Sequence, residues 1–385
     1  MKKINGISRS IVKKLAKRAK KLGQGRPVGC IGFIDNQGFI SSCSEVVNGG
    51  SSGLPYRLML SRITKQKYVS LIEMINQLPD NAAIISTKPG KTGIIVTTSG
   101  VNIFNLPIVK VGYKNNETVG VGAVYPRKEI FNLASESEKA QLKSLSALSM
   151  EEEKEALRQS TELHLKYLDI SEKISIVTEE SPENKNIFKN KFKCNDWTIP
   201  TQPKIKKIKK EFAEKLVQKS KEIEQGREVA AFGLINPNGN VKQLGDIVVG
   251  GMGYIPSRLL ASGYKDISDI SLRKAYTEVI PFNTVIVHTH PGGTGVMHIS
   301  DVMAGPGTWG RPIIAIGHDE KGNIKGVNVA EPSKKLFKLA NEKERLEQKL
   351  FEVDRSEDEV DLRKRRYEIA QEFTDLCKEI EVYKG

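Results

Sequence analysis

The chain has 385 residues, which is more than one ordinary hydrophobic core needs and suits two domains with connecting segments. Hydrophobic residues make up 38% of it, so the composition predicts a folded protein and excludes global disorder. No apolar run approaches the ~18 residues that cross a bilayer, and the start lacks a secretory signal pattern. We therefore expect a cytoplasmic protein without membrane contact.

Positive charge is concentrated in two segments of a chain whose net charge is +14. The first acidic residue, Asp35, is preceded by the basic residues Lys2, Lys3, Arg9, Lys13, Lys14, Lys17, Arg18, Lys20 and Lys21. Residues 204–210 contain a second lysine cluster. Such blocks can bind nucleic-acid phosphates or an acidic protein, and they are equally typical of solvated lysine-rich helices. Both interpretations stay open.

The first half has a recognisable order of elements. Apolar residues spaced by three and four over residues 7–22 predict an amphipathic helix. A β-hairpin is expected next, beginning near Ile31–Ile34, and a further helix separates it from a short buried strand at Ala82–Ile85. A glycine-rich loop leads to a strand near Ile108–Val111. Charged helices are expected from Arg127 to about Ile174.

The second half repeats the first. The pentapeptide QGRPV at residues 24–28 returns as QGREV at 225–229, and LPYRL at 54–58 returns as IPSRL at 255–259. After a helical insert, NAAIISTKPGKTG from residue 81 aligns with NTVIVHTHPGGTG from residue 283. The separation between matched residues is one residue larger here than before the insert. Collinear matches of this length indicate an internal duplication.

The duplication predicts a mixed α/β (α+β) protein of two similar domains, each a mixed β-sheet flanked by helices. Residues 1–180 form the first domain with its helical extension, and 181–204, rich in proline and polar residues, form a linker. Residues 205–332 form the second domain. Residues 333–385 are expected to form a charged helical hairpin with a polar break near Asp354–Asp361.

Three of the five histidines fall within eleven residues of the second domain, and two of them have metal-ligand spacing. His288 and His290 lie two residues apart, so on a strand both imidazoles face the same side. Asp301, in the first turn of a helix after the glycine-rich loop, can return a carboxylate to the same ion. Two nitrogens and one oxygen leave the fourth tetrahedral position open, as in catalytic zinc sites.

This pattern resembles the JAMM/MPN zinc metalloproteases, whose motif is a distant Glu, His-x-His-Pro, a Ser and an Asp. The resemblance covers residue 24 to about 126 and 225 to about 332, and it includes Pro291. It implies that His288, His290 and Asp301 bind Zn²⁺. It also implies that Glu228, at the start of a strand, is the general base acting on the metal-bound water.

Asp246 and Glu278 are weaker rivals for the base. One position departs from the family: His298 stands where the family has its serine, and Ser300 lies nearby on another helix face. Either His298 replaces the serine as a donor to the oxyanion, or it is a fourth zinc ligand that closes the site.

The first domain lacks the corresponding chemistry. Ser86 stands at the position of His288, Lys88 at that of His290, Ser99 at that of Asp301 and Pro27 at that of Glu228. A charged lysine repels zinc, so no metal is expected there. The chain thus resembles a degenerate and a catalytic MPN domain fused together, which implies that the two pair within one molecule.

The expected function is zinc-dependent hydrolysis of an amide or isopeptide bond. The family resemblance implies a protein or peptide substrate, such as a conjugate of a ubiquitin-like modifier. The alternative is a non-catalytic MPN scaffold with a structural zinc, which holds a protein or nucleic-acid complex.

Overall fold

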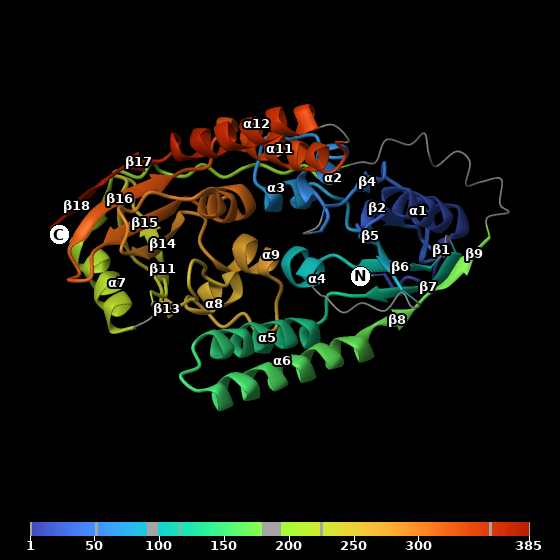
Figure 1. The fold of residues 1–385 in the computed structure, drawn as a ribbon, viewed down its shortest axis with the longest axis horizontal. Helices are drawn as coiled ribbons and strands as arrows, with labels where there is room; N and C mark the ends of the chain where they lie inside the picture. The colour runs from blue at the N-terminus through green and yellow to red at the C-terminus, as the bar shows by residue number, and fades with distance from the viewer. Residues whose placement is uncertain are drawn as a thin grey trace.

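A computed structural model describes residues 2–50, 53–90, 99–114, 117–178, 194–223, 226–353 and 356–384. We call residues 2–178 the first unit and residues 205–384 the second unit. Each unit contains a nine-stranded mixed sheet flanked by helices, which confirms the expected α/β class and the two similar sheets (Figure 1). Within the described ranges, no helix is long and apolar enough to cross a membrane.

The two sheets have the same strand order. The first runs β8-β7-β6-β5-β2-β3-β1-β9 with β4 on β2, and the second runs β17-β16-β15-β14-β11-β12-β10-β18 with β13 on β11. The first unit contains β1 (Gly6–Ser8), β2 (Val28–Ile34), β3 (Phe39–Cys43), β4 (Val47–Asn48), β5 (Ala82–Pro89), β6 (Ile108–Lys114), β7 (Glu117–Val124), β8 (Glu172–Lys173) and β9 (Ser175–Val177). The second contains β10 (Lys207–Lys209), β11 (Val229–Ile235), β12 (Asn240–Gln243), β13 (Val248–Val249), β14 (Thr284–Pro291), β15 (Ile313–His318), β16 (Ile324–Ala330), β17 (Lys378–Glu379) and β18 (Glu381–Tyr383).

The helices also follow the repeat. Those of the first unit are α1 (Arg9–Leu22), α2 (Tyr56–Ser61), α3 (Leu71–Asn76), α4 (Ser99–Phe104), α5 (Lys128–Leu145) and α6 (Met150–Ile170). Those of the second are α7 (Lys210–Glu222), α8 (Ser257–Ser262), α9 (Leu272–Lys274), η2 (Ala275–Val279), α10 (Ile299–Val302), η3 (Met303–Trp309), α11 (Lys334–Leu350) and α12 (Ser356–Thr374). The segments η2 and η3 are wide π-type helical turns.

Short strands of two or three residues are the main difference from the sequence prediction. The helix predicted from residue 7 begins at Arg9, because Ser8 caps it by accepting the backbone N–H of Ser10 with its hydroxyl group. The preceding residues form β1, which lies between β3 and β9. The segment 333–385 is a helical hairpin only as far as Thr374, and its remainder supplies β17 and β18 to the second sheet.

The predicted polar break at Asp354–Asp361 is wrong for most of that range. Helix α12 begins at Ser356, and its first turn carries Glu357, Asp358 and Glu359. Acidic side chains near a helix N-terminus interact favourably with the exposed N–H groups, so these residues begin a helix. Residues 354 and 355 lie outside the described part of the chain, as do residues 181–193 of the predicted linker.

Each sheet is covered on both faces. Helix α1 packs on the outer face of the first sheet and α7 on that of the second, with Leu15 and Leu216 fully buried in the two outer cores. Burial of such a side chain contributes roughly 1.5–3 kcal/mol. The inner faces meet the shorter helices between the sheets, where Trp309 stacks on Tyr276 with ring centroids 4.3 Å apart. Trp309 is therefore a core residue.

The units pack against each other about an approximate twofold axis. Helix α11 of the second unit contacts α2 of the first, and α5 of the first contacts α8 of the second. In the same way α3 contacts η3, and α4 contacts α9. Figure 1 shows the sheets at opposite ends, with the α11–α12 hairpin along one side and α5–α6 along the other. Such reciprocal contacts are those of a symmetric dimer built within one chain.

Two buried arginines connect the units. Arg57 donates hydrogen bonds to Asn341 Oδ1 at 2.9 Å, to the carbonyl oxygen of Gly307 at 3.0 Å and to that of Val69 at 2.7 Å. Its repeat equivalent, Arg258, donates to Asn102 Oδ1 at 3.1 Å and to carbonyl oxygens of its own unit. Both arginine residues are 1% exposed, so each guanidinium group depends on these acceptors.

Two glutamates cap helices of the opposite unit. Glu344 on α11 accepts the backbone N–H groups of Leu58 at 2.9 Å and Arg57 at 3.4 Å, at the start of α2. Glu138 on α5 accepts the backbone N–H of Leu259 at 3.2 Å, at the start of α8. Carboxylates at helix N-termini satisfy N–H groups that have no partner inside the helix. The capping contacts therefore follow the approximate twofold axis.

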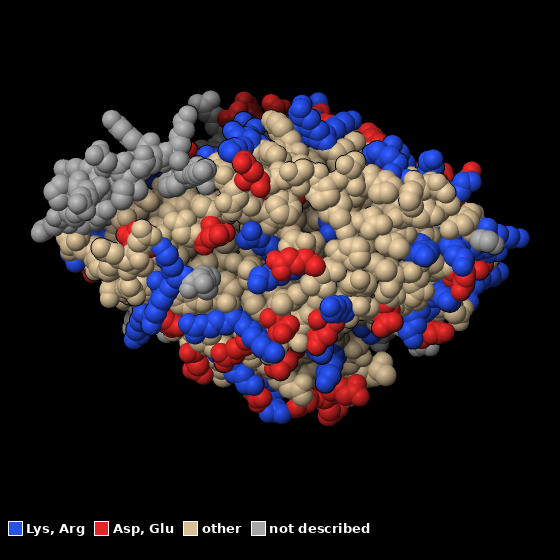
Figure 2. All heavy atoms as spheres, turned by 180° about the vertical axis from the view of Figure 1, so that it is seen from behind, with Lys and Arg blue, Asp and Glu red and all other residues tan. Residues whose placement is uncertain are grey.

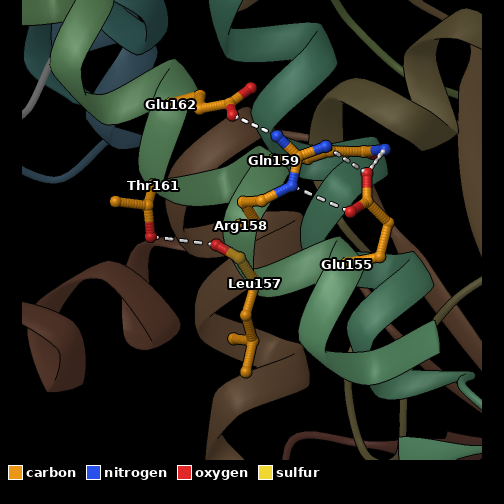
Figure 3. Close-up of polar contacts among 6 residues, drawn as sticks. All are labelled: Glu155, Leu157, Arg158, Gln159, Thr161 and Glu162. Carbon is orange, nitrogen blue, oxygen red and sulfur yellow. Dashed lines mark hydrogen bonds and ion pairs between the residues drawn. The ribbon is translucent and has the colours of Figure 1, made fainter. Parts of the chain in front are cut away.

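The α5–α6 hairpin has a solvated outer surface with charges of both signs. On α6, Arg158 pairs with Glu155 and Glu162, and Gln159 donates to Glu155 at 3.0 Å (Figure 3). Figure 2 shows acidic and basic side chains interspersed along the lower edge of the molecule, where this hairpin lies. Exposed pairs of this kind contribute little to stability, because water and salt screen them.

Candidate metal centre

Strand β14 presents His288 and His290 on one face. It pairs antiparallel with β11 and parallel with β15, and both neighbours of His288 in register are alanines, Ala230 and Ala315. Register neighbours share a face of the sheet, so these small side chains leave room for the buried imidazole. The predicted strand at 284–287 thus extends through Pro291 and carries both histidines.

The loop after β14 folds tightly onto the sheet. Gly292 and Gly295 have φ of 72° and 76°, in the left-handed region that favours glycine. A Cβ atom at Gly317 on β15 would lie 2.1 Å from the backbone nitrogen of Gly295. Only glycine permits this approach, which leads the chain back across the sheet towards α10 and its Asp301.

Asp301 brings a carboxylate to the two histidines. Its Oδ2 accepts the backbone N–H of His298 at 2.9 Å and lies 3.5 Å from His290 Nε2, while its Oδ1 lies 3.8 Å from His288 Nε2. The hydrogen bond from His298 fixes the orientation of the carboxylate at the start of α10. Within the described part of the chain, these three residues form a group whose ligand atoms lie within 4.8 Å of one another.

The donor atoms of this group fit a tetrahedral zinc ion. Ligands about 2.0–2.1 Å from zinc are about 3.3 Å apart at a tetrahedral angle. The His288 Nε2 to His290 Nε2 distance is 2.9 Å, and the two histidine–carboxylate distances are 3.8 and 3.5 Å. His288 Nδ1 is 2.9 Å from the carbonyl oxygen of Ile314, so Nδ1 donates and Nε2 keeps its lone pair for a metal.

The protonation states of His288 and Asp301 suit a metal, whereas at His290 burial is outweighed by the contact with Asp301, which raises the pKa of this histidine. Burial, reinforced by the neighbouring His290, lowers the pKa of His288 to about 4, so this ligand is neutral at pH 7. Burial alone would raise the pKa of Asp301, but its contact with His290 and the charge of His288 leave that pKa below the ordinary value. The centre therefore offers a neutral imidazole and an ionised carboxylate.

Glu228 lies beside the centre. It directly precedes β11, and continuation of the β11–β14 register places it opposite His290. Its backbone pairs with that of Gly250 and Gly251 at 2.8 and 3.0 Å. Burial raises the pKa of this 7% exposed glutamate to about 7, with His290 opposing the shift and Asp301 adding to it. Its carboxyl group thus lies near His290 and Asp301 and is close to half-protonated at neutral pH.

The remaining predicted residues lie outside this three-residue group. His298 is exposed, with its ring centroid 6.1 Å from that of His290, and it is outside the three-residue ligand group. Glu278 lies on η2 and lines a cavity of about 500 Å³ with Asp80 and Arg273. Asp246 follows β12, with its backbone N–H bonded to Gly263.

Thr289 helps to position the site, a role that was not predicted from the sequence. Its side chain faces away from the histidines, and its Oγ1 accepts the backbone N–H of Val229 at 3.1 Å. It therefore ties β14 to the first residue of β11, next to Glu228. Behind it, Ser220 Oγ lies 3.0 Å from Nε2 of the buried His318. The only available signal was that Thr87 and Thr289 are identical in both copies.

The first unit keeps the scaffold of this centre and changes its side chains. Thr87 Oγ1 accepts the N–H of Val28 at 3.0 Å, and the carbonyl oxygen of Pro27 accepts the N–H of Gly49, as that of Glu228 accepts Gly250. Ser86 and Lys88 take the histidine positions on β5. Ser99 begins α4, and its side chain lies outside the described part of the structure.

Comparison of the sequence with protein-family models gave no match. Comparison with curated proteins gave none either.

Proposed function

We propose that the protein is a zinc-dependent hydrolase of amide or isopeptide bonds of the JAMM/MPN type. The observation that carries this proposal is the convergence of His288, His290 and Asp301 with Glu228 next to them. Three protein ligands leave one tetrahedral position for a water molecule or a substrate, which distinguishes catalytic from structural zinc sites. The absence of all four residues from the first copy supports a specific role for them.

Each residue has a defined part in this proposal. A bound zinc ion would lower the pKa of its water to about 7 and polarise the substrate carbonyl group. Glu228 accepts a proton from the attacking water and returns it to the leaving amine, and its pKa of about 7 suits both transfers. The exposed ring of His298 is available as a donor to the tetrahedral oxyanion.

We infer a protein or peptide substrate, with a ubiquitin-like modifier joined to lysine as the preferred class. This rests on the sequence resemblance to JAMM/MPN proteases. The four cysteines form no disulfide, which agrees with the reducing cytoplasm as the site of action. In this proposal the first unit is an inactive partner that supports the catalytic one through Arg57, which bonds to Gly307 just after the ligand-bearing α10.

Metal analysis and turnover of a ubiquitin-like fusion test the proposal together. Wild type should bind one zinc per chain and release the modifier, and His290→Ala should lose both properties. Glu228→Gln should keep the zinc while turnover falls by about 10²- to 10⁴-fold, the usual contribution of a general base. Glu278→Gln is the matched control and should keep full turnover. If instead Glu278→Gln is inactive and Glu228→Gln is active, the base is misassigned.

The variant His298→Ser distinguishes an open centre from a closed one. It restores the serine of the resembled family, so zinc stoichiometry and turnover should both persist. Loss of zinc in this variant would make His298 a fourth ligand. Together with no hydrolysis of any conjugate by wild type, that result would favour the alternative function, a non-catalytic scaffold with a structural zinc. Salt-sensitive binding to RNA or DNA would then point to its partner.

A further inference from the structure

The first unit has two lysines where the second has its metal centre. Ser86 on β5 is in register with Lys110 on the parallel strand β6, and Lys88 follows two residues later on the same face. Lys110 corresponds in the strand pairing to Ala315, so this second lysine has no counterpart in the metal centre. The first unit has therefore acquired positive charge at this position.

These lysines lack a compensating negative charge. Both are partly buried, and among the described residues neither forms an ion pair or a hydrogen bond. Desolvation lowers the pKa of Lys110 to about 8, with Lys88 adding to the effect, and desolvation also lowers the pKa of Lys88. Among the residues that the structure describes, no carboxylate is one of the charges that act on either group. Two neighbouring ammonium groups in this setting repel each other and lose hydration.

A serine hydroxyl group completes the set of donors. Ser86 is 1% exposed, and its Oγ has no hydrogen-bond partner among the described residues. A buried hydroxyl group without a partner costs free energy, and most such groups in proteins are satisfied. Ser86, Lys88 and Lys110 thus place donors and positive charge on one face of the sheet.

We propose that the first unit binds a phosphate group at this position, held by Ser86, Lys88 and Lys110. A phosphate group carries more than one negative charge at neutral pH and accepts several hydrogen bonds, so it can compensate both lysines and the serine at once. A carboxylate offers a single charge and leaves one lysine uncompensated. The two copies of one scaffold then recognise opposite charges: a cation in the second unit and an anion in the first.

Calorimetric titration with inorganic phosphate at pH 7 tests this site. The protein should be metal-free and carry His290→Ala, so that no phosphate binds at the metal centre. Binding should weaken at least tenfold in Lys110→Met and in Lys88→Met, and several-fold in Ser86→Ala. Lys114→Met is the matched control, because Lys114 is an exposed lysine on the same strand as Lys110. The phosphate affinity of this variant should be unchanged.

A second measurement keeps the test independent of folding defects. In phosphate-free buffer, Lys110→Met should unfold at a higher temperature than the parent protein, because one of two repelling charges is removed. Added phosphate should raise the thermal unfolding temperature of the parent protein, which keeps Lys110. Equal phosphate affinity in the parent and Lys110→Met would overturn the proposal. So would the absence of binding at tens of millimolar phosphate. Acetate binding as tight as phosphate binding would overturn the choice of a phosphate group.

Discussion

At the scale of single residues, Thr289 links the strand of His288 and His290 to the residue after Glu228. It stands between His288 and His290, and its Oγ1 holds the backbone N–H of Val229, the residue after Glu228. The ligands and the base lie on different strands, so their relative position depends on such cross-strand contacts. Catalytic groups displaced by even 1 Å can lose much of their effect.

The variant Thr289→Val removes this hydroxyl group without changing the shape of the side chain. The N–H of Val229 then lacks its partner, which should cost about 1–3 kcal/mol of unfolding free energy. Zinc should remain bound because the ligands are intact, and turnover should fall because Glu228 is less firmly placed. Urea unfolding and modifier release measure the two effects.

The control for this prediction is Thr87→Val in the first unit, where Thr87 accepts the N–H of Val28 in the same way. It should cost similar stability and leave turnover unchanged. An equal loss of turnover in Thr87→Val would show that the effect of Thr289→Val is a general loss of stability.

The grouping of His288 with His290 was accessible to prediction from the sequence. Alternation along a strand places His288 and His290 on one face, and this needs no knowledge of the neighbouring strands. The partner of His288 Nδ1 and the position of Lys110 were not accessible. Both depend on parallel pairing of β14 with β15 and of β5 with β6, which joins segments separated by a helical insert and a loop.

At the scale of elements, Glu138 and Glu344 link the two units through the starts of α8 and α2. Desolvation raises the pKa of each to about 7, although Arg258 or Arg57 and the capped N–H groups oppose the shift. Their pKa in the unfolded chain is near 4.5. Between pH 4.5 and about 7, the folded protein therefore keeps these two carboxyl groups more protonated than the unfolded chain does.

This difference sets the direction of a pH effect. Each carboxyl group contributes stability that is fully present below about pH 4.5 and is lost as the pH rises through about 7. The loss is on the order of 1–3 kcal/mol per group. The thermal unfolding temperature should thus fall between pH 5.5 and pH 8, and the double variant Glu138→Gln, Glu344→Gln should flatten this fall. An identical pH profile in the double variant would contradict the assignment.

The shortest strands could not be predicted from the sequence. β1 and β10 have three residues each and β8 and β17 two, too few for an alternating pattern to appear. They pair with distant partners: β1 lies beside β9, which follows two long helices. Helix α12 was expected to begin later because acidic residues suggested a loop, whereas their place in its first turn favours the helix.

At the scale of the whole molecule, the units are coupled through η3. This segment begins two residues after Asp301, a proposed metal ligand, and the carbonyl oxygen of its Gly307 accepts a hydrogen bond from Arg57 of the first unit. Arg57 also donates hydrogen bonds to Asn341 on α11 and to Val69 in its own unit. A contact from the first unit therefore supports the segment that follows the helix of Asp301.

The pair Arg57→Lys and Arg258→Lys tests this coupling. A lysine cannot reproduce the planar, forked donors of arginine, so each variant should lose about 2–4 kcal/mol of unfolding free energy. Only Arg57→Lys should also weaken zinc binding, by about tenfold, because Arg258 bonds to no residue of η3. Competition with a zinc chelator measures the affinity. Equal zinc affinities in the two variants would argue against support across the interface.

The duplication and the existence of two α/β units followed from the sequence because matching motifs stay collinear over long stretches. The orientation of the units did not follow. It depends on buried arginines and helix-capping glutamates, and Arg57 and Arg258 look like ordinary repeat positions until their partners on the other unit are known.

The order of the two units has a consequence for synthesis on the ribosome. The first sheet is complete once β9 has emerged at Val177, whereas the second waits for β18, which ends at Tyr383. At ~5–20 residues per second, roughly 10–40 s separate these events. The first unit can thus fold first and offer α2, α3 and α4 as a surface while the second unit is still being translated. The group of His288, His290 and Asp301 therefore meets the first unit as soon as it forms.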